Sequence, residues 1–63
     1  MNSVPNLLTE QGAAGVLNCS VAFLRKCRLF KTGPVYLKLG RLVRYRLEDL
    51  AAYIDASIQG LAA

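Results

Sequence analysis

The sequence predicts a small α+β domain with three short helices and a two-stranded β-hairpin between the second and third helices. Three observations predict this fold. A chain of 63 residues can bury only one core. Residues 9–31 have the apolar spacing of two helices, each preceded by a residue that caps helices well. Residues 35–46 alternate apolar and polar side chains on either side of a glycine, which is typical of a hairpin.

The first predicted helix follows a short lead-in. Thr9 is a good N-cap, and Glu10 comes next, where a negative charge suits the positive end of the helix dipole. We therefore predict the first helix at residues 10–17. Its two glycines indicate either a weak helix or a close approach by another part of the backbone. The chain then divides into three parts: an N-terminal arm at residues 1–8, the domain at residues 9–58 and a C-terminal tail at residues 59–63.

A tight turn, Leu17-Asn18-Cys19-Ser20, separates the first helix from the second. Asn18 tolerates the left-handed backbone conformation that such a turn needs, and Ser20 is a good N-cap. The second helix is predicted from Val21 to about Lys31. A helical wheel gives it an apolar inward stripe of Phe23, Leu24, Cys27 and Phe30. Its outward face combines basic with small or aliphatic residues: Val21, Ala22, Arg25, Lys26, Arg28 and Leu29.

The two cysteines, Cys19 and Cys27, give no metal-binding pattern. There is no C-x-x-C motif and no histidine in the sequence, so we expect neither a metal site nor a cofactor. Both cysteines fall where a core residue is needed, which favours buried thiols. A disulfide is the weaker alternative, because it would close only a short loop.

Thr32-Gly33-Pro34 is expected to end the second helix and to lead into the hairpin. Its strands are predicted at residues 35–39 and 42–46, joined at Gly40-Arg41. Alternation divides the strand side chains into two sets, with Leu37, Val43 and Tyr45 toward the core and Lys38, Arg44 and Arg46 outward.

The last helix is predicted from about Leu47 to Ser57, with Glu48 and Asp49 in its first turn. Its apolar stripe consists of Leu47, Leu50, Ile54 and Ile58. Because a two-stranded hairpin is unstable alone, we expect this helix to pack against it and to close the core.

The charges of this chain are strictly segregated along the sequence. All eight Lys and Arg residues lie between Arg25 and Arg46, and none of the four acidic residues falls in that window. A solvated protein face usually interleaves both signs of charge. The segregation therefore favours a polyanionic partner over a merely solvated surface.

No catalytic or membrane-spanning pattern accompanies these charges. The sequence has no histidine and no phosphate-binding glycine loop, and its carboxylates fall on separate predicted elements, so we expect no enzyme activity. No segment approaches the roughly 18 unbroken apolar residues of a membrane span, and residues 1–5 have no basic region. We therefore expect a cytoplasmic protein.

The residues around the turn and the hairpin resemble a known family. Apolar residues occupy the offsets that helix-turn-helix units use, with Asn18 at the usual glycine: Ala13, Ala14, Leu17, Cys19, Leu24 and Cys27. The segment from Lys31-Thr32-Gly33-Pro34 through residues 38–46 to Asp49-Leu50 is similar to the small MerR-like winged helix-turn-helix domain. Excisionases (recombination directionality factors) and phage regulators of the AlpA type share that domain. The likeness covers roughly residues 7–55.

The resemblance implies that the second helix enters the major groove of DNA and that the hairpin is a wing contacting the flanking backbone or an adjacent minor groove. Because Val21-Ala22-Phe23 lacks polar side chains, Arg25 is the first candidate for a bidentate guanine contact. Lys26 and Arg28 are expected to bind phosphates. The full set of expected DNA-binding residues is Ser20, Val21, Ala22, Arg25, Lys26, Arg28, Lys38, Arg41 and Arg44.

The function that the resemblance implies is that of a sequence-specific architectural protein. Such a protein binds repeated sites cooperatively, bends DNA and directs an integrase toward excision. The expected partners are double-stranded DNA, an integrase or recombinase, and further copies of the chain on DNA, but no membrane. A transcriptional regulator of the AlpA type on the same fold is the nearest alternative, and a protein-interaction module is a more distant one.

Overall fold

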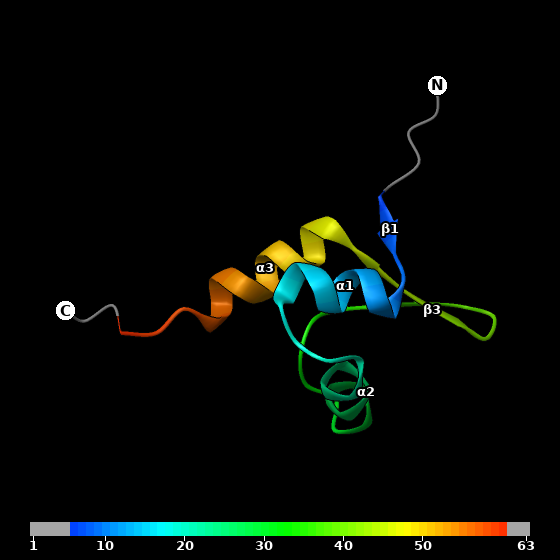
Figure 1. Cartoon of the computed structure of the whole chain (residues 1–63), viewed down its shortest axis with the longest axis horizontal. Helices are drawn as coiled ribbons and strands as arrows, with labels where there is room; N and C mark the ends of the chain where they lie inside the picture. Colours follow the sequence, from blue (N-terminus) through cyan, green and yellow to red (C-terminus); the bar gives the residue numbers. More distant parts are fainter. Residues whose placement is uncertain (1–5, 61–63) are drawn as a thin grey trace.

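The computed structural model describes residues 6–60 of the chain. Within them the fold is a small α+β arrangement of three helices and a three-stranded antiparallel sheet (Figure 1). The elements in chain order are β1 (Leu7–Leu8), α1 (Glu10–Leu17), α2 (Val21–Leu29), β2 (Leu37–Leu39), β3 (Leu42–Arg46) and α3 (Leu47–Ser57). None of these helices is long and apolar enough to cross a membrane. Most of the predicted N-terminal arm and of the C-terminal tail lies outside the described residues.

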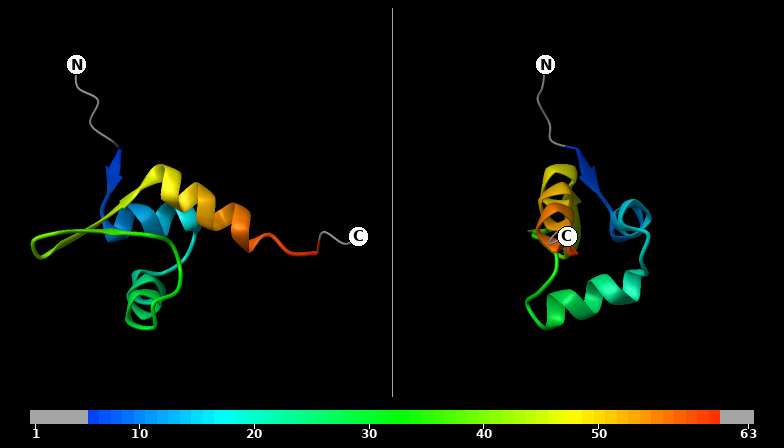
Figure 2. Two further views of the ribbon diagram at one scale, coloured as in Figure 1. Left: turned by 180° about the vertical axis from the view of Figure 1, so that it is seen from behind. Right: turned by 90° about the vertical axis from the view of Figure 1, so that its left-hand side faces the viewer.

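Helix α1 is the central element, since it contacts β1, β3, α2 and α3. Helix α2 lies to one side of the other helices and is seen nearly end-on in Figure 1 and lengthwise in the right view of Figure 2. The predicted caps are confirmed: Thr9 Oγ1 accepts a hydrogen bond from Gly12 N at 3.1 Å, and Ser20 Oγ accepts one from Phe23 N at 3.0 Å. Asn18 has the predicted left-handed conformation, with φ 56°.

Helix α2 ends at Leu29, two residues before the predicted end. Lys31 adopts a left-handed conformation with φ 58°, and Thr32 N donates to the Cys27 carbonyl at 2.8 Å, which stops the helix. The next turn requires glycine. Gly33 has φ +79°, and a Cβ added there would lie 2.7 Å from Cys27 Cβ.

Strand β3 is the centre of the sheet, between β1 and β2. β1 pairs Leu8 with Tyr45, so part of the predicted arm is a third strand rather than only a lead-in. On the other side of β3, Leu39 pairs with Leu42 across the turn at Gly40, which has φ 65°. The predicted hairpin is therefore present, but its first strand begins at Leu37, two residues later than predicted, and its second strand is paired on both edges.

The register of the hairpin corrects the prediction for Leu37. Leu37 lies opposite Arg44, and Lys38 lies opposite Val43. Directly opposed residues share one face of a sheet. Leu37 therefore lies on the face opposite Val43 and Tyr45, and Lys38 lies on the same face as Val43, the reverse of what we predicted for both β2 residues. The two-residue turn causes this difference, because it pairs an odd-numbered residue on β2 with an even-numbered one on β3.

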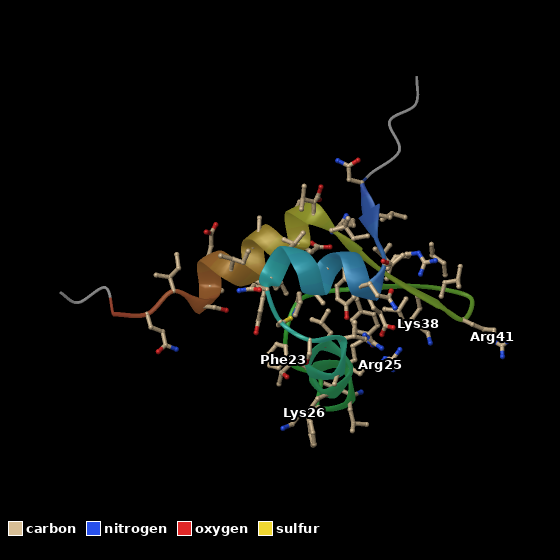
Figure 3. All side chains as sticks on the ribbon, viewed as in Figure 1. Phe23, Arg25, Lys26, Lys38 and Arg41 are labelled. Carbon is tan, nitrogen blue, oxygen red and sulfur yellow. The ribbon has the colours of Figure 1, made fainter. Side chains whose placement is uncertain are left out.

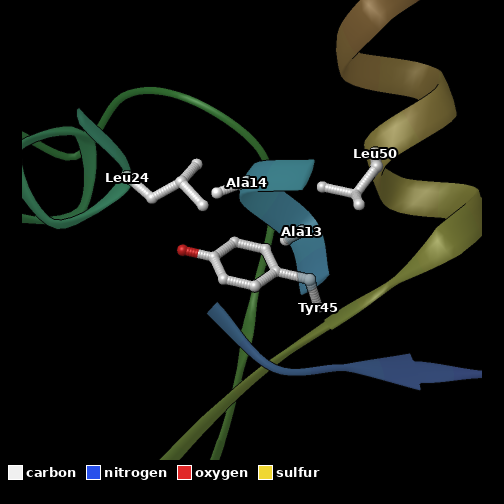
Figure 4. Packing of buried hydrophobic residues seen from close by; sticks show 5 residues of the cluster. All are labelled: Ala13, Ala14, Leu24, Tyr45 and Leu50. Atoms are coloured by element: carbon white, nitrogen blue, oxygen red, sulfur yellow. The ribbon is translucent and has the colours of Figure 1, made fainter. Parts of the chain in front are cut away.

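The core is small and lies where α1 meets α2, α3 and β3. Leu24, Tyr45 and Leu50 are its largest fully buried side chains, and Figure 4 shows them around the two alanines of α1. Alanine allows these three side chains to approach the α1 backbone from three different elements. The fully or nearly buried apolar residues are Ala13, Ala14, Leu24, Cys27, Tyr45 and Leu50.

Half of the predicted inward stripe of α2 is exposed. Leu24 and Cys27 are buried as predicted, whereas Phe23 and Phe30 are exposed. The same holds for α3, in which Leu50 is the one buried member of the predicted stripe within the described residues. The physical reason is size: α1 covers only one strip of each neighbouring helix, and within residues 6–60 no further layer covers the rest. Phe23 and the end of α3 instead line an open apolar hollow of about 310 Å³.

The two glycines of α1 do not mark a close contact with another part of the backbone. A Cβ at Gly12 would make ordinary contacts at 3.5 Å, and a Cβ at Gly15 would meet nothing within 4 Å. The structure therefore leaves the interpretation of α1 as a weak helix.

Cys27 is a buried free thiol as predicted, while Cys19 is free and half-buried. Burial raises the pKa of the Cys19 thiol.

Candidate nucleic-acid interface

The exposed basic side chains come from helix α2, from the turn that follows it and from the β2–β3 hairpin. Figure 3 shows Arg25 and Lys26 on α2, Lys38 on the hairpin and Arg41 at its tip. All four residues are exposed. The basic side chains of α2 and of the hairpin thus gather in one part of the structure, although Glu10 lies among them and Arg46 pairs with the first turn of α3.

An open hollow of about 430 Å³ connects α2 and the hairpin. It is lined by the start of α1, including Glu10. Four arginines, two from α2 and two from the hairpin, also line it: Arg25, Arg28, Arg41 and Arg44. Tertiary structure thus brings together basic residues that are up to 19 positions apart in the sequence.

Glu10 is the acid at the centre of this basic surface. Its carboxylate accepts hydrogen bonds from Arg25 Nε at 3.2 Å and from Arg25 Nη2 at 3.0 Å. It also accepts a bond of 2.6 Å from Arg28 Nη2. The hydrogen bonds from Arg25, followed by that from Arg28, lower the pKa of Glu10 from 4.5 to about 2, against the opposing effect of burial. Glu10 is therefore ionised throughout the physiological range.

Arg28 is not on the outward face, so that part of the helical-wheel prediction is wrong. Its side chain is only 18% exposed, and its Nη1 donates to the Tyr45 hydroxyl at 2.8 Å. The guanidinium carbon also lies 5.6 Å from the centre of the Tyr36 ring. Arg28 thus joins α2 to the sheet, because the Tyr45 hydroxyl on β3 accepts its hydrogen bond. Its predicted phosphate contact stays a prediction.

The start of α2 differs from the prediction at one residue. Val21 is half-buried and packs against the core, although the wheel assigned it to the outward face. Ala22 is exposed as predicted. Ser20 is exposed too, and its hydroxyl oxygen already accepts the capping bond from Phe23 N.

At the base of the hairpin, Arg46 is paired with α3. Its Nε donates to Asp49 Oδ2 at 2.6 Å, and its Nη1 lies 3.5 Å from Glu48 Oε2. The hydrogen bond from Arg46 lowers the pKa of Asp49. Arg44 is half-buried, and its Nη1 donates to the neighbouring Val43 carbonyl at 2.7 Å.

Three of the eight basic residues are therefore engaged in ion pairs: Arg25, Arg28 and Arg46. Within residues 6–60 the other five form no salt bridge, namely Lys26, Lys31, Lys38, Arg41 and Arg44. These five lie on α2, on the turn that follows it and on the hairpin. A surface of this kind can bind the phosphates of a polyanion by charge-assisted hydrogen bonds.

Two residues of this surface were missed in the sequence. The sequence predicts Lys31 at the end of the second helix, yet its left-handed conformation places it in an exposed turn. From the sequence, Glu10 is only a favourable charge at a helix start. Its separation in sequence from Arg25 and Arg28 hides their contact, and the one available signal was that Glu10 is the single acid preceding the basic window.

The chain matches no protein-family model and has no significant match among the curated proteins with which it was compared. Among the described residues, no group of three or more His, Cys, Asp or Glu side chains is placed to hold a metal ion. A functional assignment therefore depends on the residues and on their geometry.

Proposed function

We propose that this protein binds double-stranded DNA in a sequence-specific manner, as a winged helix-turn-helix domain. In this proposal α1 and α2 form the helix-turn-helix, and the β2–β3 hairpin is the wing. The observation that carries the proposal is the position of the five basic side chains without an ion pair in residues 6–60. They lie on α2, the turn after it and the hairpin, the parts that this architecture presents to DNA.

The residues divide into base contacts and phosphate contacts. Arg25, in the middle of α2 and 62% exposed, is assigned to a guanine in the major groove. Lys26 on the same helix and Lys38 and Arg41 on the hairpin are assigned to phosphates on either side. Arg28 holds α2 against the sheet, so it acts mainly by fixing the angle at which α2 enters the groove.

The biological role that we propose is that of an excision factor for a mobile element. The support for it is the resemblance of the turn and hairpin residues to excisionases. Copies bound at adjacent sites would bend DNA and direct an integrase toward excision. Integrase-dependent excision, measured with and without this protein, tests this role. If excision does not depend on the protein while it occupies a promoter, it is a transcriptional regulator instead.

The DNA-binding proposal is tested by fluorescence anisotropy with a labelled duplex at increasing salt concentration. If each of the five basic side chains without an ion pair contacts one phosphate, the slope of log association constant against log salt concentration is near −4 to −5, because each contact contributes about −0.9. The variant Arg41→Ala should reduce the slope by about 1 and weaken binding to all sequences equally. Arg41→Lys is the matched control, since it retains the charge and should retain the slope. No affinity for any duplex even at low salt would refute the proposal.

A further inference from the structure

The Arg25 guanidinium is held at one edge and open at the other. Its Nε and Nη2 both donate to the Glu10 carboxylate, whereas within residues 6–60 its Nη1 has no hydrogen-bond partner. Because the guanidinium is planar and its five N–H groups are fixed in direction, the bonds to one edge also set the direction of the other edge. The open edge carries N–H groups of Nη1 and Nη2, which suit the O6 and N7 acceptors of guanine.

Glu10 can hold Arg25 in this way because it is itself fixed. It lies in the first turn of α1, directly after the Thr9 cap, and its side chain is only 15% exposed. The second bond, of 2.6 Å from Arg28 Nη2, fixes the carboxylate from the other side. Arg28 is in turn fixed by the Tyr45 hydroxyl of the central strand. The orientation of Arg25 is thus set by a chain of contacts that ends in the core.

We propose that Glu10 is a positioning residue that determines the sequence specificity of Arg25. This inference rests on the proposed DNA binding. An arginine without Glu10 could turn either edge toward a phosphate or a base, and would bind many sequences through its charge. Held by Glu10, Arg25 offers one edge in one direction. That edge can donate hydrogen bonds to O6 and N7 of a guanine at a fixed position, and it matches the acceptors of other bases poorly.

Glu10 also cancels part of the positive charge at the centre of the basic surface. It is ionised, and it lines the same hollow as four arginines. DNA phosphates approaching this surface are therefore attracted less than the arginines alone would attract them. Glu10 consequently has two effects of opposite sign: it weakens binding to DNA in general, and it strengthens the preference for one sequence.

The test compares Glu10→Gln with the matched variant Glu48→Gln. Both substitutions remove one negative charge, but Glu48 lies on α3, is 73% exposed and is 3.5 Å from Arg46. The probes are a duplex selected by the wild-type protein from a randomised pool and a scrambled duplex of equal length. The ratio of their Kd values measures specificity. Both variants should bind the scrambled duplex more tightly, whereas only Glu10→Gln should lose specificity, by about tenfold.

A structural role alone would not produce this pattern, since a weakened fold lowers the affinity for both duplexes together. Glu10→Asp gives a second measurement, because it retains the charge but shortens the reach to Arg25. It should reduce specificity while leaving the affinity for the scrambled duplex near the wild-type value. In an Arg25→Ala background, Glu10→Gln should have no further effect on specificity.

A specificity ratio equal to the wild-type ratio in both Glu10 variants would overturn the inference and leave the proposed DNA binding intact. A loss of specificity in Glu10→Gln that persists in the Arg25→Ala background would also overturn it, because the effect would not act through Arg25. If the wild-type protein bound neither duplex, the proposed function itself would be refuted.

Discussion

Acid should remove the stability that Glu10 contributes to this fold. Hydrogen bonds from Arg25 and Arg28 lower the pKa of Glu10 in the folded chain from 4.5 to about 2. A carboxylate with a lowered pKa stabilises the fold fully above its ordinary pKa, and this contribution is lost as the pH falls through the folded value. For Glu10 the loss therefore extends from pH 4.5 down to about 2.

The size of this contribution follows from the same two pKa values. Each tenfold change in acidity corresponds to about 1.4 kcal/mol, so the full linkage between 4.5 and about 2 would be about 3 kcal/mol. Arg25 is 62% exposed and its attraction is screened by water, while Arg28 is only 18% exposed. We therefore expect a smaller contribution, about 1–2 kcal/mol. This remains a large fraction of the roughly 3–9 kcal/mol expected for a chain of this length.

The assay is urea unfolding of the wild type and of Glu10→Gln across the acid range. Asp49 also has a lowered pKa and loses its stabilising charge in acid, so the wild type alone does not isolate Glu10. The difference in unfolding free energy between the two proteins should be about 1–2 kcal/mol near neutral pH and should shrink toward zero near pH 2. Glu48→Gln is the control, because its exposed pair with Arg46 is screened by water and should contribute little to the unfolding free energy.

A difference that stays constant between neutral pH and the lowest pH at which the protein folds would refute this reasoning. It would mean that the carboxylate charge of Glu10 is not what stabilises the contact between α1 and α2. The absence of any difference at neutral pH would refute it equally, since Arg28 would then lose its partner at no cost.

Two further predictions concern the packing of α2. Gly33→Ala should destabilise the fold by more than about 2 kcal/mol in urea unfolding, because Gly33 has a positive φ and the new Cβ would lie 2.7 Å from a side chain of α2. The control is Gly15→Ala, where a Cβ meets nothing within 4 Å and should stabilise the fold by about 0.5–1 kcal/mol. Equal effects at the two sites would contradict this account of the turn at Gly33. Tyr45→Phe should cost about 1–2 kcal/mol, because Arg28 Nη1 would lose its 2.8 Å partner in a half-buried position; an unchanged unfolding free energy would show that water replaces the hydroxyl.

The local features of this chain could be predicted from its sequence because they depend on nearby atoms. Thr9 and Ser20 cap helices through the amides three residues ahead, and Asn18 adopts the left-handed conformation that few other residues tolerate. The hairpin register is also a local feature. The two-residue turn at Gly40 already determines that Leu37 opposes Arg44, which the alternation within each strand by itself does not reveal.

The sequence by itself therefore determined three helices, the N-caps of the first two, the hairpin and the separation of basic from acidic residues along the chain. Tertiary structure decided which faces are covered and which charges are paired. A helical wheel cannot tell that α1 covers Leu24 but leaves Phe23 and Phe30 exposed. Nor can it tell that Glu10 bonds to Arg25 and Arg28. These outcomes depend on how elements far apart in the chain fit around a core of six residues, and that fit is set by the volumes of all of them together.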